Sequence, residues 1–88
     1  AEMVAHGKPA PDVYLLAAQK LNLPPEALLG VEDSPSGVQS AHAAGMTVAM
    51  VPDQDEPSAE IAALCALVAP TLEGIIPFIE KLNANKFD

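Results

Sequence analysis

Two adjacent carboxylates, Glu32 and Asp33, stand where an apolar run over residues 27–31 ends. Ser34-Pro35 follows them directly, as at the start of a helix. Neighbouring carboxylates held in place repel one another unless a proton or a cation intervenes. Mg²⁺ takes one or two carboxylates with waters and phosphate oxygens, and the free N–H groups of a helix start attract anions. The pair is therefore a candidate site for magnesium and phosphate; the alternative is two acids at a loop edge, one capping and one solvated.

A single lysine, Lys8, lies in the proline-flanked segment HGKPAPD, residues 6–12, and is one of only four cations in the chain. An ammonium group beside a metal-bound phosphate would neutralise charge during phosphoryl transfer. The alternative is an ordinary surface lysine. His6, in the same segment, would either line such a site or simply be exposed.

The apolar pattern alternates between helices and short strands. Strands are expected at 27–31, 46–51 and 67–68, each too apolar to face water. Buried strands joined by crossover helices predict an α/β fold, a partial doubly wound, Rossmann-like parallel sheet. In such sheets the sites form outside the carboxyl ends of the strands, where Glu32 and Asp33 stand.

Residues that start and stop helices give the expected boundaries. Asp12 and Ser34 are expected to cap the helices that follow them, and Gly45 to end the second one. Pro77 should kink or divide the last helix, and residues 83–88 should form a loose tail. Three small side chains share one face of the second helix and predict close packing on the sheet: Val38, Ala41 and Ala44.

Charge and cysteine content narrow the partners and the compartment. Twelve acids against four lysines and no arginine give a net charge of −8, which argues against nucleic acid and anionic membrane surfaces as partners. No apolar run is long enough to span a bilayer, and no signal-peptide pattern opens the chain. The lone Cys65 fits a buried structural thiol in a reducing compartment, so a cytoplasmic location is expected.

Two linked motifs, GKPAPDVYLLAAQKL and EDSPSGVQSAHAAGM, resemble the C-terminal half of the haloacid dehalogenase-like hydrolase superfamily, within its phosphatase/β-phosphoglucomutase-like group. The resemblance is strong over residues 4–52 and weak beyond. It implies that Lys8 steadies a nucleophilic carboxylate and the transferring phosphoryl group. It further implies that Glu32 and Asp33 hold Mg²⁺, Asp33 directly and Glu32 directly or through water. Ser34 opens the turn that follows and is a candidate phosphate-binding residue.

The function that the resemblance implies is Mg²⁺-dependent phosphoryl transfer, as a phosphatase or phosphomutase, on a small phosphorylated metabolite such as a sugar phosphate. The family works through an aspartyl-phosphate intermediate, which is nucleophilic catalysis by a carboxylate. The nucleophile of the family lies in an Asp-x-Asp motif after an N-terminal strand. The only such motif here, residues 53–55, does not follow that pattern and is interpreted as a solvated turn.

The chain is therefore expected to be one partial core domain over residues 1–88, without the nucleophile strand and the cap domain. Such a piece should have little turnover alone. The alternative is a non-catalytic α/β module that binds a partner or a metal. An exposed sheet edge would then capture the missing N-terminal half or a second copy of the chain.

Overall fold

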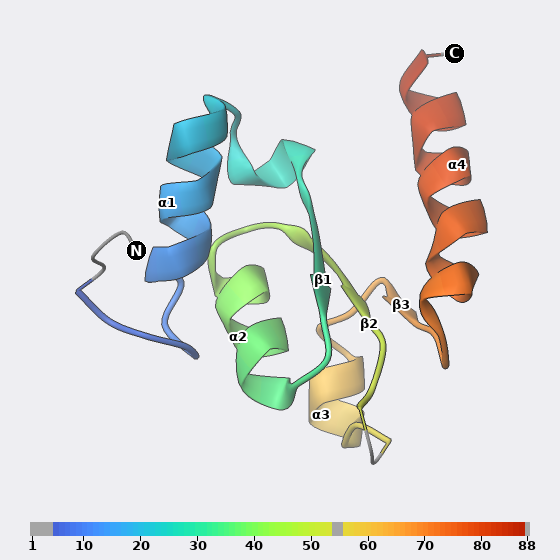
Figure 1. Cartoon of the computed structure of the whole chain (residues 1–88), viewed down its shortest axis with the longest axis horizontal. Coiled ribbons are helices and arrows are strands. Elements are labelled where there is room, and N and C mark those ends of the chain that lie inside the picture. The colour runs from blue at the N-terminus through green and yellow to red at the C-terminus, as the bar shows by residue number, and fades with distance from the viewer. Residues whose placement is uncertain (1–4, 54–55, 88) are drawn as a thin grey trace.

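The computed structural model describes residues 5–53 and 56–87, which form alternating helices and strands (Figure 1). Two short 3₁₀ turns, Pro25–Ala27 and Leu72–Gly74, precede β1 and α4. The elements are, in chain order, α1 (Asp12–Leu21), β1 (Leu29–Glu32), α2 (Pro35–Ala43), β2 (Thr47–Met50), α3 (Ala59–Ala62), β3 (Leu67–Val68) and α4 (Ile75–Phe87).

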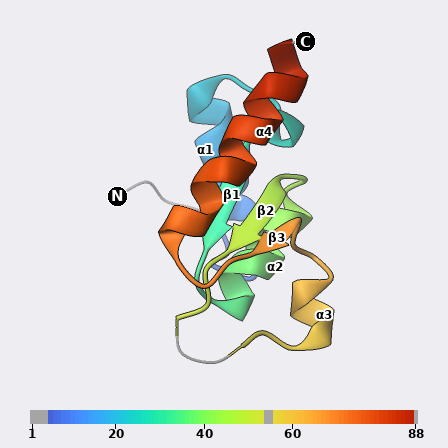
Figure 2. The same ribbon diagram turned by 90° about the vertical axis from the view of Figure 1, so that its right-hand side faces the viewer.

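The three strands form one parallel sheet in the order β1-β2-β3, with Gly30 opposite Val48 and Ala49 opposite Leu67. The helix α2 connects β1 to β2, and α3 connects β2 to β3. Figure 2 shows α4 in front of the sheet and α2 behind it, so helices lie on both faces. The predicted parallel α/β sheet with crossover helices is confirmed. Among the described residues β1 pairs with β2 alone, so β1 is an edge strand.

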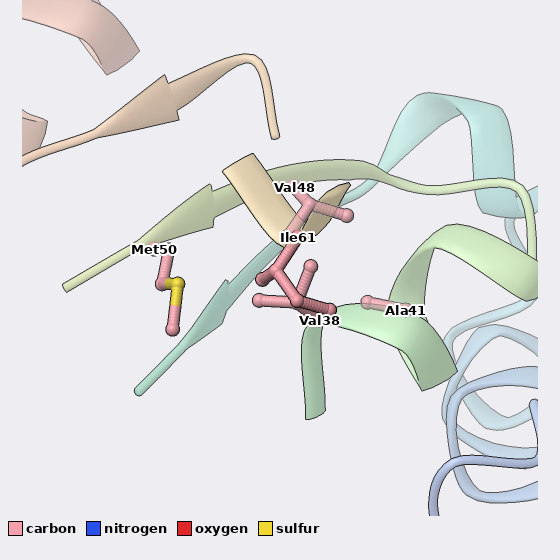
Figure 3. Packing of buried hydrophobic residues seen from close by; sticks show 5 residues of the cluster. All are labelled: Val38, Ala41, Val48, Met50 and Ile61. Atoms are coloured by element: carbon pink, nitrogen blue, oxygen red, sulfur yellow. The ribbon is translucent and has the colours of Figure 1, made fainter. Parts of the chain in front are cut away.

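The larger of two buried clusters lies between the sheet and the helices α2 and α3 (Figure 3). Its members are Val38, Ala41, Val48, Met50 and Ile61. The close approach predicted for α2 is confirmed, because a Cβ added at Gly30 would lie 3.1 Å from Cβ of Ala41. A smaller cluster under α4, on the opposite face, comprises Ala49, Ala69 and Ile75.

One face of β1 is less covered than the sequence predicts. Val31 is 41% exposed, although the strand was expected to be buried on both faces. The helix α4 buries Ile75 against the sheet but leaves Ile76 55% exposed. The prediction of a fully buried strand is therefore wrong at Val31, because α4 covers only part of that face.

The structure corrects three predicted helix boundaries. Asp12 is the first residue of α1 and does not cap it, since its carboxylate accepts a hydrogen bond from the backbone N–H of His6 at 3.0 Å. Pro77 neither kinks nor divides a helix, because α4 begins at Ile75 and first-turn N–H groups have no intrahelical partner. The expected loose tail is wrong as far as Phe87, where α4 ends. Asp88 lies outside the described residues.

Other predicted boundaries are confirmed. Ser34 caps α2 as predicted, accepting a hydrogen bond from the N–H of Gly37 at 3.2 Å. Ser58 caps α3 in the same way and accepts from the N–H of Ile61 at 3.3 Å. Gly45 follows α2 with φ +94°, the conformation that ends a helix with least steric cost in glycine. Within the described ranges, no helix has the length and hydropathy needed to cross a bilayer.

Shortening one side chain of the larger cluster tests how α3 is held. Ile61→Val should lower the free energy of unfolding by about 1 kcal/mol, because Ile61 is only 8% exposed and its shortening leaves a small cavity. Urea denaturation measures the change. The matched control Ile76→Val, at a side chain 55% exposed, should leave the midpoint almost unchanged. Equal effects of the two substitutions would contradict the packing described for α3.

Candidate functional site

The two acids at the end of β1 lie in different environments. Glu32 is the last residue of the strand and its side chain is 7% exposed, whereas Asp33 is exposed. Successive residues of a strand point to opposite faces of a sheet. Gly30 and Glu32 accordingly share the face covered by α2. The neighbouring carboxylates are therefore separated by burial, and they are suited to different tasks.

Glu32 forms an ion pair with the predicted lysine. Nζ of Lys8 donates to Oε2 of Glu32 at 3.1 Å, across 24 residues of sequence. The same ammonium lies 5.5 Å from the ring centroid of Tyr14 on α1. Because Lys8 remains 40% exposed, it is accessible from solvent while a buried carboxylate fixes its position. The structure thus brings together two of the residues that the sequence singled out.

The first turn of α2 completes the surroundings of Glu32. A Cβ placed on Gly37 would collide with Oε1 of Glu32, so the carboxylate occupies the space that any side chain would need. The N–H of Gly37 donates to Oγ of Ser34, which holds this turn in place. Any side chain at position 37 would therefore displace the buried carboxylate, whereas the backbone conformation there does not itself call for glycine.

Asp33 lines two hollows at the carboxyl ends of the strands. The first, of about 480 Å³, is bounded by Val31, Glu32, Asp33, Val51, Pro52, Asp53 and Leu72. The second, of about 580 Å³, has Asp33, Ser34 and Asp53 among its lining residues, with the start of α3 on its far side. Asp33 lies at the boundary of both, at the edge where parallel sheets bind ligands.

Asp33 and its surroundings fit part of a magnesium site. Across residues 5–53 and 56–87, no cluster of three or more histidine, cysteine, aspartate or glutamate side chains is arranged to hold a metal ion. Mg²⁺, however, takes only one or two protein carboxylates and fills its other positions with water and phosphate oxygens. Glu32 is already paired with Lys8. Of the two acids, Asp33 is therefore the one whose exposed carboxylate is left available to such an ion.

Ser34 lies next to Asp33 with its hydroxyl already engaged. Oγ of Ser34 accepts from Gly37 and lies 3.4 Å from Oγ of Ser36. A hydroxyl that accepts one bond keeps a proton to donate. Its part in phosphate binding stays a prediction.

Removing that cap tests how strongly the site depends on it. Ser34→Ala should lower the free energy of unfolding by about 1 kcal/mol, because the N–H of Gly37 loses its acceptor. Thermal or urea denaturation measures the change. Ser36→Ala, an exposed serine on the same helix, is the matched control and should change little. A larger loss for Ser36→Ala would show that Ser34 is not the cap.

Other candidate residues lie apart from this pair. His6 is exposed, with Nδ1 3.3 Å from Oδ2 of Asp12, so it borders the loop of Lys8 without contacting Glu32 in the described structure. Cys65 donates its thiol to the carbonyl of Ile61 at 3.5 Å, and burial raises its pKa, as expected for a structural rather than nucleophilic thiol. Of the Asp-x-Asp motif only Asp53 is described; residues 54 and 55 lie outside the described residues.

Sequence reasoning missed three residues that contact the ion pair or the loop of Lys8: Tyr14, Gly37 and Ser40. Ser40, completely buried on α2, donates to the carbonyl oxygen of Ala10 at 2.7 Å and so reaches the loop of Lys8. Local sequence patterns do not predict contacts between residues that lie 24 or 30 positions apart. A serine on the buried side of α2, among Gly37, Val38 and Ala41, was the one available signal.

Known proteins share this arrangement of sequence and fold. Protein CbbY of Rhodobacter capsulatus is 57% identical over 51 residues, which are 58% of this chain and 22% of that protein. Hexitol phosphatase A of Escherichia coli K12 is 55% identical over 51 residues, 58% of this chain and 24% of its own. The crystal structure of CbbY from Rhodobacter sphaeroides in complex with phosphate superposes with a TM-score of 0.73 at 32% identity, covering 83% of this chain and 32% of that one.

These relatives are much longer than the matched region, so the chain spans less than a quarter of the curated proteins it resembles. The range matched by the family model, residues 1–51, contains the loop of Lys8, β1, Asp33 and α2. The family described as haloacid dehalogenase-like hydrolase matches residues 1–51, more than half of the chain. On this match and the shared fold, the chain belongs to the haloacid dehalogenase-like hydrolase family.

Proposed function

We propose that this chain forms part of a Mg²⁺-dependent phosphoryl-transfer enzyme, a phosphatase or phosphomutase acting on a small phosphorylated metabolite such as a sugar phosphate. The observation that carries the proposal is the ion pair of Lys8 with the buried Glu32, 3.1 Å long, beside the exposed Asp33. A relative named as a hexitol phosphatase and a CbbY structure containing phosphate support the substrate class.

In this proposal the two acids have separate tasks. Glu32 fixes the ammonium of Lys8, which neutralises negative charge on a transferring phosphoryl group. Asp33 offers its carboxylate to Mg²⁺, with the Ser34 hydroxyl nearby as a donor to phosphate oxygens. A bound Mg²⁺ would shield the charge that otherwise opposes attack of a carboxylate on a phosphate. Because Glu32 is paired with Lys8, its role in this proposal is to hold Lys8, and Asp33 is the magnesium ligand.

The proposal places the attacking carboxylate outside this chain. The family resemblance implies a nucleophilic aspartate in an Asp-x-Asp motif after an N-terminal strand, whereas the only such motif of this chain, residues 53–55, comes after β2. We infer that these 88 residues correspond to the C-terminal part of a core domain. Within the described part of the chain one edge of β1 is unpaired, and an adjoining strand would lie there, beside the strand that Asp33 follows.

A non-catalytic module is the second candidate, favoured by the same edge of β1 and by the exposed Val31. An edge strand with an apolar side chain can pair with another polypeptide, either a complementary half or a second copy. Such a module would bind its partner without turnover.

Hydrolysis of a generic phosphate ester tests the proposal, in the chain and in any longer native form identified by intact mass. Turnover should require Mg²⁺ and fall about 100-fold in Asp33→Asn, because a charge-stabilising ligand is lost. Glu60→Gln, an exposed acid on α3, is the control and should leave the rate unchanged. A native protein with no turnover and no response to Mg²⁺ would contradict the enzyme proposal and favour the module.

A further inference from the structure

Ser40 connects α2 to the loop that carries Lys8. Its side chain is completely buried, and Oγ donates to the carbonyl oxygen of Ala10 at 2.7 Å, across 30 residues of sequence. Serine is unfavourable inside a helix unless its hydroxyl finds a partner. The buried residues Val38 and Ala41 on the same helix are apolar, and the partner of the Ser40 hydroxyl is the carbonyl oxygen of Ala10 in the loop. The hydroxyl therefore serves the contact with the loop.

That contact fixes the turn on which Lys8 lies. The N–H of Ala10 donates to the carbonyl oxygen of Gly7 at 3.0 Å, so residues 7–10 form a tight turn with Lys8 in its first central position. The N-terminal side of the loop is held by His6 and Asp12, but His6 is exposed and water competes for that bond. Ser40 supplies the buried attachment.

The same helix also fixes the other member of the ion pair. Gly37, three residues before Ser40, leaves the space that the carboxylate of Glu32 fills. Positions three apart in a helix lie on the same side. One side of α2 therefore sets both the carboxylate and the turn from which the ammonium extends.

We propose that Ser40 is a positioning residue for Lys8: its hydroxyl holds the turn 7–10 so that the ammonium meets Glu32. The functional meaning of this position rests on the phosphoryl-transfer function proposed above, whereas the geometric claim does not. Loss of the hydroxyl leaves the carbonyl of Ala10 without its donor and lets the turn move away from α2.

The side-chain ammonium NMR signal of Lys8 in the 88-residue chain tests this claim. An ammonium held by a carboxylate exchanges slowly enough with water to be seen, so Lys8→Arg should remove the signal and assign it, and Glu32→Gln should broaden it. In Ser40→Ala the signal should be lost although the fold, followed by circular dichroism, persists. Ser36→Ala removes an exposed hydroxyl from the same helix and should leave the signal intact.

Each outcome decides the proposal. A Lys8 ammonium signal that is unchanged in Ser40→Ala would overturn the proposal and leave Ser40 a purely structural role. A Lys8 signal that is unchanged in Glu32→Gln would also overturn it, because the ammonium would then not be held by Glu32. If Ser40→Ala does not fold, Ser40→Cys replaces it, because cysteine has a similar shape and a weaker donor. The Lys8 signal should then be broadened in Ser40→Cys and retained in Ser36→Ala. An unchanged Lys8 signal in Ser40→Cys would also overturn the proposal. Phosphate-ester turnover is assayed separately, so an inactive protein with the expected NMR pattern would refute the function alone.

Discussion

Gly37→Ala is expected to destabilise the chain by about 2–3 kcal/mol, although alanine is the better helix former by roughly 1 kcal/mol. The reason is the carboxylate of Glu32, which fills the position of the new methyl group. Glu32 is 7% exposed and cannot swing into water without leaving Lys8. The substitution therefore forces either a shift of α2 or loss of the ion pair, and both outcomes weaken the end of β1.

Urea denaturation measures this effect, and the chain offers a matched control. A Cβ added at Gly7 meets no atom within 4 Å, so Gly7→Ala should leave the midpoint nearly unchanged. A Gly37→Ala chain as stable as the wild type would show that the carboxylate of Glu32 does not occupy that space. In a longer native form with turnover, Gly37→Ala should also lower the rate, because it disturbs the lysine through Glu32.

Lys8→Met is expected to have the largest effect on turnover, a loss of about 10³-fold in the active protein, since removal of a cation from a transferring phosphoryl group has effects of this order. It should also lower the free energy of unfolding by about 2 kcal/mol at neutral pH, because a carboxylate that is 7% exposed loses its partner. Methionine keeps an apolar stem near Tyr14, so the change isolates the charge.

Two comparisons make this prediction sharp. Lys81→Met removes a lysine from the exposed side of α4 and should change neither stability nor rate appreciably. Adding Glu32→Gln to Lys8→Met should restore part of the lost stability, since no unpaired buried charge remains. Stability lost equally in Lys8→Met and Lys81→Met would mean that the pair with Glu32 contributes little.

Local patterns in the sequence predicted the elements that carry the site. The cap at Ser34, the close face of α2 and the glycine that ends it all follow from short-range chemistry, and the structure confirms them. The predicted location of Glu32 and Asp33 at the carboxyl end of the first strand is also confirmed. What sequence could not predict is the division between them, because that depends on which acid faces α2 and meets a lysine 24 residues away.

The failures of prediction have the same origin. Asp12 was expected to cap α1, but its carboxylate instead binds the backbone of His6. Pro77 was expected to break a helix, but the helix begins only two residues earlier. In both cases the helix boundary depends on the conformation of the neighbouring residues, which the local pattern does not specify. The roles of Gly37 and Ser40 could not be predicted, because each depends on a contact with a residue outside its own helix, Glu32 and Ala10 respectively.

A magnesium titration followed through carboxylate carbon NMR signals tests whether Glu32 and Asp33 have separate roles. We expect the carboxylate signal of Asp33 to shift saturably with MgCl₂ and that of Glu32 to remain unshifted, because Glu32 stays paired with Lys8. The response at Asp33 should be absent in Asp33→Asn. Glu60→Gln should leave the titration unchanged. If the Glu32 signal shifts while the Asp33 signal does not, or if Asp33→Asn leaves the titration unchanged, the two acids do not have these separate roles.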